Sequence, residues 1–123
     1  MIKRKGILKI AIDSPAAAGA GTVAKTISKY YNLLYLDTGK IYRIIAFNKL
    51  KYPKKFNIKF IKKKIKNLKL KDFSDKKLLS DEVGTEASVI AKKKNIRKLV
   101  HSFQTNFAYN PPKKNVWSCL DWR

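Results

Sequence analysis

The stretch IAIDSPAAAGAGT, Ile10 to Thr22, decides the fold that this sequence predicts. It begins inside an apolar run over residues 7–12, continues through small residues and opens into a helical pattern, so we expect a strand, a tight loop and a helix. Small residues let backbone N–H groups approach an anion closely, and the positive end of the helix dipole points at the same place. The stretch therefore predicts a phosphate-binding loop. Simple close packing of strand and helix is the alternative that these residues leave open.

The loop matches the strict phosphate-loop signature only in part. That signature is Gly, four residues, Gly, Lys and then Ser or Thr. Ser14 stands where the first Gly belongs and Ala20 where the Lys belongs, whereas Gly19 and Thr22 match. Losing one preorganised charge-stabilising donor typically costs about a hundred- to a thousandfold in rate.

Hydrophobic periodicity predicts the order of the remaining elements. We expect helices over residues 21–31, 40–50, 86–94 and 96–107, strands over 33–36 and 116–120, and a helix in 54–67 with Ile58, Ile61 and Ile65 on one side. Leu68, Leu70 and Phe73 predict a short strand, Asn32 is placed to end the first helix, and Thr85 is expected to cap the helix after it. Strands separated by helices predict a parallel sheet, whose ligands lie beyond the carboxyl ends of the strands.

The composition is ordinary in apolar content but strongly basic. Lys and Arg total 29 against 8 acidic residues, giving a net charge of +21. Such a balance is typical of proteins that bind nucleic acid or another anionic surface, and a solvated lysine surface is the simpler alternative. The single cysteine, Cys119, excludes an intramolecular disulfide and fits a reducing cytoplasm. We expect no metal site at His101 and no membrane segment, because no apolar stretch is long enough to span a bilayer.

Four further blocks give the sequence a family resemblance. They are DTGKIYR (37–43), LLSDEVGT (78–85), NIRKLVHSFQTNFAY (95–109) and SCLDWR (118–123). Together with the loop, these blocks resemble bacterial cytidylate kinases, nucleoside monophosphate kinases of the phosphate-loop superfamily, in the family's order and roughly its spacing. Trp122 departs from the family, which has Gly there. Family members continue for about as long again, so the resemblance covers their first half.

The resemblance implies an α/β fold, namely a three-layer phosphate-loop kinase fold with a parallel sheet, truncated before the lid and the last strands. It implies three parts: a first part of the phosphate-loop core over 1–53, a small monophosphate-binding insertion over 54–85, and core helices with the third strand over 86–123.

The resemblance also implies a set of site residues. The ATP phosphates would lie against Ser14, Pro15, Ala16, Ala17, Ala18, Gly19, Ala20, Gly21 and Thr22, with Mg²⁺ near Thr22. Arg43 and Arg123 would be the catalytic arginines that hold the acceptor phosphate. The remaining substrate-binding residues would be Thr38, Ser88, Arg97 and Asp121. Asp37 would orient Mg²⁺ waters or the loop, or act as an ordinary turn carboxylate.

The implied activity is transfer of the ATP γ-phosphoryl group to CMP or dCMP in pyrimidine nucleotide metabolism, by a cytoplasmic enzyme that is monomeric at full length. We expect these 123 residues alone to turn over negligibly, because the loop cation and the lid arginines are missing. The alternative function is that of a small basic nucleic-acid-binding protein without catalysis. Uridylate or adenylate specificity is the nearer rival, although the residues around Thr38, Arg97 and Asp121 favour cytidylate.

Overall fold

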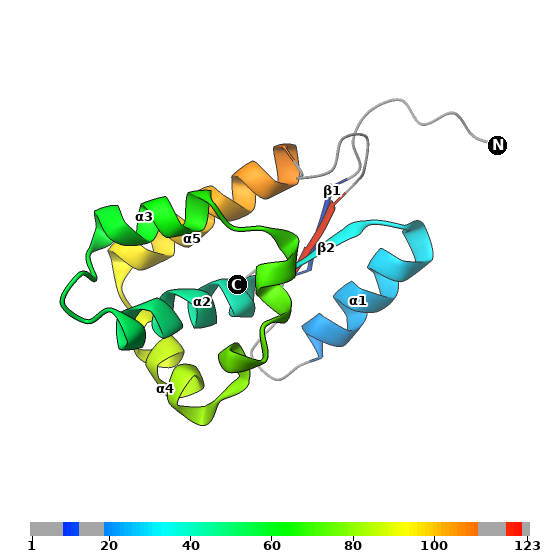
Figure 1. The fold of residues 1–123 in the computed structure, drawn as a ribbon. Helices are drawn as coiled ribbons and strands as arrows, with labels where there is room; N and C mark the ends of the chain where they lie inside the picture. The colour runs from blue at the N-terminus through cyan, green and yellow to red at the C-terminus, as the bar shows by residue number, and fades with distance from the viewer. Residues whose placement is uncertain (1–8, 13–18, 111–117, 122–123) are drawn as a thin grey trace. The chain divides into compact units, whose positions relative to one another are not determined.

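The computed structural model describes residues 9–12, 19–110 and 118–121 (Figure 1). The chain forms two compact units: unit 1 is Met1–Thr38 with Gln104–Arg123, and unit 2 is Gly39–Phe103. In chain order the described elements are β1 (Lys9–Ile12), α1 (Ala20–Tyr31), β2 (Leu34–Asp37), α2 (Thr38–Lys51), α3 (Ile58–Lys66), the 3₁₀ helices η1 (Leu70–Ser74) and η2 (Lys76–Leu79), α4 (Asp81–Ile90), α5 (Lys94–Tyr109) and β3 (Ser118–Asp121). The structure is therefore of the mixed α/β class with mostly helical content, and the three-part division expected from the sequence stays a prediction.

Unit 1 contains a small parallel sheet. Within the described residues it has three strands in the order β1–β3–β2, and β3 pairs in parallel with both neighbours. The predicted strands are confirmed where they are described, although residues 7–8 and 116–117 lie outside the described ranges. A strand order that places the last strand between the first two requires each connection to cross over, as in βαβ units.

The helix α1 ends as the sequence predicts. Asn32 adopts the left-handed conformation, with φ 55°, and its backbone N–H donates to the Ser28 carbonyl. An αL residue after the last turn is a common helix C-cap. Ala24 and Leu33 are buried, and Ile10, Ile12, Ile27 and Tyr35 pack against them. Val23 and Tyr30 are exposed, whereas Ala24 and Ser28 are buried. The buried face of α1 is therefore formed by small residues.

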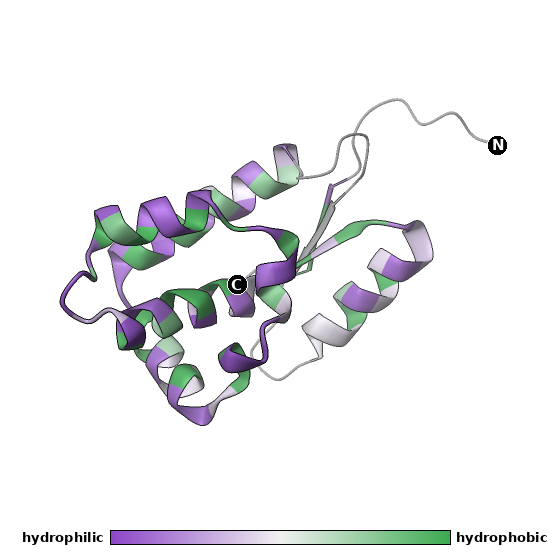
Figure 2. Ribbon diagram, in the orientation of Figure 1, coloured by the Kyte–Doolittle hydropathy of each residue, from purple (hydrophilic) through white to green (hydrophobic). Residues whose placement is uncertain are grey.

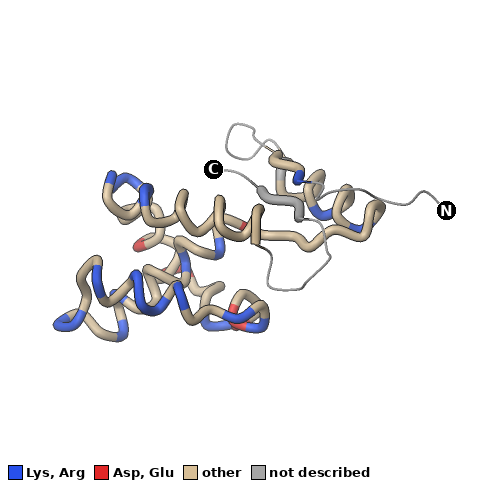
Figure 3. Tube along the Cα trace, turned by 90° about the horizontal axis from the view of Figure 1, so that it is seen from above, with Lys and Arg blue, Asp and Glu red and all other residues tan. Residues whose placement is uncertain are grey.

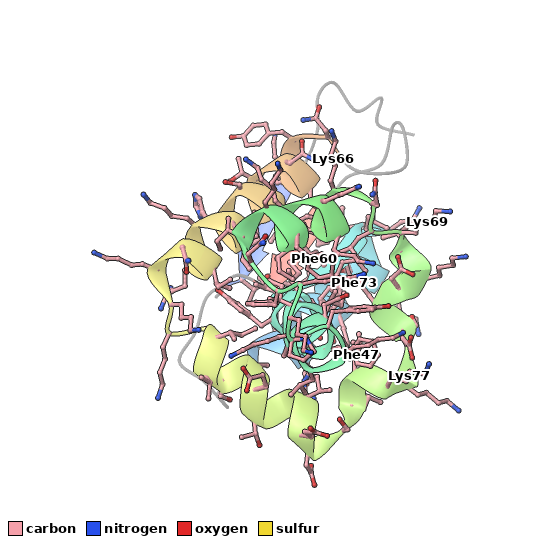
Figure 4. All side chains as sticks on the ribbon, turned by 60° about the vertical axis from the view of Figure 1, so that its left-hand side comes forward. Phe47, Phe60, Lys66, Lys69, Phe73 and Lys77 are labelled. Carbon is pink, nitrogen blue, oxygen red and sulfur yellow. The ribbon has the colours of Figure 1, made fainter. Side chains whose placement is uncertain are left out.

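Unit 2 has an aliphatic core. Ile41, Ile45, Ile61, Ile90 and Ile96 are all at most 1% exposed. The stripe expected on α3 is confirmed at Ile61 and Ile65, whereas Ile58 is exposed. Apolar and polar residues alternate along these helices with the helical period (Figure 2). Phe60 and Phe73 point inward, whereas Lys66, Lys69 and Lys77 lie on the outside of the unit (Figure 4).

The strand expected from Leu68, Leu70 and Phe73 is wrong, because Leu70–Ser74 forms η1. The Asp72 carboxylate accepts a hydrogen bond from the Lys69 N–H at 2.8 Å, and the Asp72 N–H donates to the Lys69 carbonyl at 2.9 Å. Acidic side chains favour such local bonds over a strand ladder.

The helix expected over 86–94 begins earlier, at Asp81, and its N-cap is Ser80 rather than Thr85. The Ser80 hydroxyl accepts a hydrogen bond from the Val83 N–H at 3.2 Å. Asp81 and Glu82 then occupy the first turn, where negative charge interacts favourably with the helix dipole. The cap and the two acids together explain why the helix starts one turn earlier than its apolar pattern suggests.

Candidate functional site

The carboxyl ends of the strands in unit 1 lie level with one another. The register pairs Asp121 with Ile12 on one side and with Asp37 on the other. The chain leaves β1 at Ile12 and enters α1 at Ala20, so the segment between them starts at this edge of the sheet. Parallel sheets bind ligands beyond this edge. The predicted residues Ser14, Pro15, Ala16, Ala17 and Ala18 fall outside the described residues.

The described end of the loop is Gly19, the N-cap of α1. Its φ is +85° and its ψ is 14°, a left-handed conformation that costs other residues strain. Its carbonyl accepts the first helical bond, from the Val23 N–H at 3.1 Å. Gly21 and Thr22 follow in the first turn, and Thr22 is exposed. A hydroxyl oxygen is the kind of hard donor that Mg²⁺ prefers, and the predicted contact of Thr22 with Mg²⁺ stays a prediction.

Thr38 is held by a residue that sequence reasoning did not single out. The Gln104 side-chain N–H donates to the Thr38 hydroxyl at 2.8 Å, and both residues are buried, at 1% and 0% exposure. A hydroxyl that accepts a bond still has a proton to donate. The bond fixes the start of α2 in unit 1, and the predicted contact of Thr38 with the acceptor nucleotide stays a prediction.

Arg43, in unit 2, lies against the segment before α4. Its Nη1 donates to the Leu78 carbonyl at 2.7 Å and to the Ser80 carbonyl at 3.5 Å. Arginine has five N–H donors in a fixed fork, so bonds from one nitrogen do not exhaust the set. Arg43 therefore has a structural role in unit 2 and also retains the fork geometry that recognises phosphate.

Gly84 leaves room for this guanidinium. A Cβ at position 84 would lie 3.0 Å from Nη2 and 3.3 Å from Nη1 of Arg43. Such contacts are tight, and the bond from Arg43 to Leu78 restricts how far the side chain can yield. The glycine of the LLSDEVGT block thus allows the Arg43 guanidinium to pack against α4.

The other predicted base-contacting residues of unit 2 are Ser88 and Arg97, and both are exposed. The Ser88 hydroxyl donates to the Gly84 carbonyl at 3.2 Å, one turn earlier in α4. Burial raises the pKa of the Tyr42 hydroxyl above its ordinary value of 10.0, and the charge of Arg97 offsets part of that rise. Arg97 thus lies close enough to Tyr42 to act on it electrostatically. The predicted contacts of Ser88 and Arg97 with the base stay predictions.

The remaining predicted positions are described less fully. Asp121 is the last residue of β3, and Arg123 lies outside the described residues. The side chains described contain no group of three or more His, Cys, Asp or Glu that could hold a metal ion. None of the described helices combines the length and apolar character needed to cross a membrane.

Comparison with known proteins gives a consistent result. A family model described as cytidylate kinase matches residues 10–116. The chain is similar to the cytidylate kinase of Rhodopseudomonas palustris (strain BisA53), with 38% identity over 104 residues that make up 84% of this chain and 49% of that protein. It is also similar to the cytidylate kinase of Bartonella tribocorum, with 41% identity over 84% of this chain and 48% of that protein. The cytidylate kinase of Rhodospirillum rubrum is 33% identical over 93% of this chain and 54% of that protein. The chain thus spans about half the length of the curated relatives it matches.

Proposed function

This chain belongs to the cytidylate kinase family, and on that premise we propose that the protein transfers the γ-phosphoryl group of ATP to CMP or dCMP. The observation that carries the proposal is the match over residues 10–116, which includes the described end of the loop and the arginine-bearing helices of unit 2. The proposal includes the phosphate-loop kinase fold and a cytoplasmic location.

Unit 1 would bind the phosphates of ATP. The backbone of Gly19 and the first turn of α1 supply N–H groups and the positive end of a helix dipole. Thr22 would hold Mg²⁺, which supplies charge neutralisation on the transferred group when bound. The loop has no lysine at Ala20, so backbone groups carry a larger share of the phosphate interaction than in the strict signature.

Unit 2 would bind the acceptor nucleotide. Arg43 would donate from the nitrogens other than Nη1 to the CMP phosphate, while its bond to the Leu78 carbonyl fixes the plane of the guanidinium. Ser88 and Arg97 would contact the cytosine ring, since both are exposed. Arg97 carries several N–H donors, and the Ser88 hydroxyl would turn from the Gly84 carbonyl to the base. In-line phosphoryl transfer needs positioning and charge stabilisation more than covalent chemistry, and these donors supply both.

A binding experiment on the 123-residue chain tests this proposal. Isothermal titration with CMP, dCMP, UMP and AMP at one salt concentration compares the bases directly. We expect CMP and dCMP to bind at least about tenfold more tightly than AMP, since a site built to pair with a base loses several hydrogen bonds with the wrong one. Equal affinity for all four nucleotides would refute recognition of cytosine. The expectation that these residues alone have negligible turnover is checked by a coupled assay for CMP-dependent ADP formation.

A further inference from the structure

The α2–α3 corner of unit 2 concentrates positive charge without acidic neighbours in sequence. Between Asp37 and Asp72 the chain has no carboxylate side chain, and Lys is its commonest residue type. Lys and Arg crowd this part of the trace (Figure 3). In the part of the chain that the structure describes, the ion pair that forms joins Lys49 to Glu86, and it does not involve the lysines at the tip of the corner.

Three of these lysines gather around one aromatic ring. The ammonium groups of Lys51, Lys55 and Lys64 lie 5.4, 6.0 and 5.4 Å from the centroid of the Tyr52 ring. Phe60 stacks edge-on against the same ring, with centroids 5.8 Å apart. All three lysines are exposed and Tyr52 is half-buried. We call these four residues, Lys51, Tyr52, Lys55 and Lys64, the Tyr52 cluster.

The packing of the corner keeps this charge in place. Asn57 caps α3 by accepting a hydrogen bond from the Phe60 N–H at 2.8 Å, and Ile61 and Ile65 of the same helix are buried. The cap and the buried isoleucines fix α3, which carries Lys64, while Lys51 is the last residue of α2. Because each ammonium group lies within 6.0 Å of one ring centroid, any two of them are at most about 12 Å apart, close to the screening length of about 8 Å at physiological salt, so they repel one another. A polyanion that binds all three relieves this repulsion and releases its own counterions.

We propose that the Tyr52 cluster is a binding surface for single-stranded nucleic acid, separate from the nucleotide-binding residues proposed above. Single strands are held by cationic grooves combined with aromatic rings, which is the pair of features present here. A duplex or an anionic membrane surface would use the lysines but not the ring. The proposal does not depend on kinase activity.

The test is fluorescence anisotropy with a labelled oligouridylate of about 12 nucleotides, a length within the site sizes of known single-strand binders. The variant Lys51→Gln, Lys55→Gln, Lys64→Gln is compared with a control of equal charge, Lys92→Gln, Lys93→Gln, Lys94→Gln, whose lysines are also exposed in unit 2. We expect the cluster variant to weaken binding about tenfold or more and to reduce the salt slope by about 2, since single strands give about 0.7 per phosphate contact. The control should change both quantities much less.

A second variant, Tyr52→Leu, removes the ring and leaves the charge. It should weaken oligouridylate binding about fivefold or more, the lower end of what base stacking contributes. Equal losses in the cluster variant and its control would mean that only long-range charge acts, and would overturn the proposal. Binding to phosphatidylserine vesicles with no binding to the oligonucleotide would overturn it as well. Circular dichroism checks that each variant keeps its helices.

Discussion

The two units of this chain differ in what supports their predicted ligand-binding residues. In unit 1 the described strands are four residues long, and the described buried apolar residues include Ala24, Leu33, Leu36 and Phe107. In unit 2 a set of isoleucines is fully buried, and Arg43 is bonded to two backbone carbonyls. The comparison indicates that side-chain bonds and packing hold the predicted phosphate-binding Arg43 of unit 2, whereas the predicted phosphate-binding loop of unit 1 depends at its described end on the backbone conformation of Gly19.

The largest expected effect comes from opening the core of unit 2. Ile45 is 0% exposed, and Ile45→Ala should lower the free energy of unfolding by about 2 to 5 kcal/mol through lost burial and the cavity left behind. Amide hydrogen exchange read across residues 39–103 measures the loss. A change below about 1 kcal/mol would mean that this core is not the support that the comparison assigns to unit 2.

The next effect concerns the bonds of Arg43. Arg43→Gln should lower the free energy of unfolding by about 1.5 to 3 kcal/mol, because it removes charge-assisted bonds to the Leu78 and Ser80 carbonyls. Denaturant titration gives the value. Arg43→Lys is the control that keeps the charge but loses the fork, and an unchanged stability in both variants would remove Arg43 from the structural account.

The backbone of unit 1 is tested at Gly19. Gly19→Ala should destabilise the protein by about 1 to 2 kcal/mol, the cost of a left-handed conformation for a residue with a Cβ. Gly21→Ala is the matched control two residues later, inside α1, where alanine should be neutral or stabilising by up to about 1 kcal/mol. Thermal melting compares the two, and an equal response would contradict the importance of the Gly19 conformation.

The smallest effect is a dependence on pH at Tyr42. Because burial raises the pKa of its hydroxyl in the folded state, unfolded chains lose this proton first, so stability falls as the pH rises through and above 10.0. Tyr42→Phe should lack this part of the decline while matching the parent protein near neutral pH. Urea titrations at several pH values from neutral to alkaline detect the difference. Identical curves for the two proteins would show that the raised pKa makes no contribution.

Local signals in the sequence predicted much of the fold. Asn32 marks the end of α1, and the spacing of Ile61 and Ile65 identifies the buried face of α3. The short segment after α3 was predicted wrongly. Leu68, Leu70 and Phe73 have the apolar spacing of a strand, but the Asp72 carboxylate accepts a bond from the Lys69 N–H and stabilises a 3₁₀ helix instead.

The support of the candidate site could not be predicted from the sequence. The bond from Gln104 to Thr38 joins residues 66 positions apart, and that from Arg43 to Leu78 joins residues 35 positions apart. No period or local motif encodes such pairs, since they depend on how the elements pack. The steric fit of Gly84 against Arg43 has the same origin.

The central claim is that unit 2 recognises CMP through Arg43, Ser88 and Arg97. A titration of the isotopically labelled chain with CMP, followed by the backbone amide and arginine Nε–Hε signals, tests it most directly. The account predicts saturable shifts at these three residues and at Gly84, with AMP producing much smaller ones. Shifts confined to the lysines of α3 and the Tyr52 cluster, equal for CMP and AMP, would contradict it and leave only the attraction of any phosphate to a basic surface.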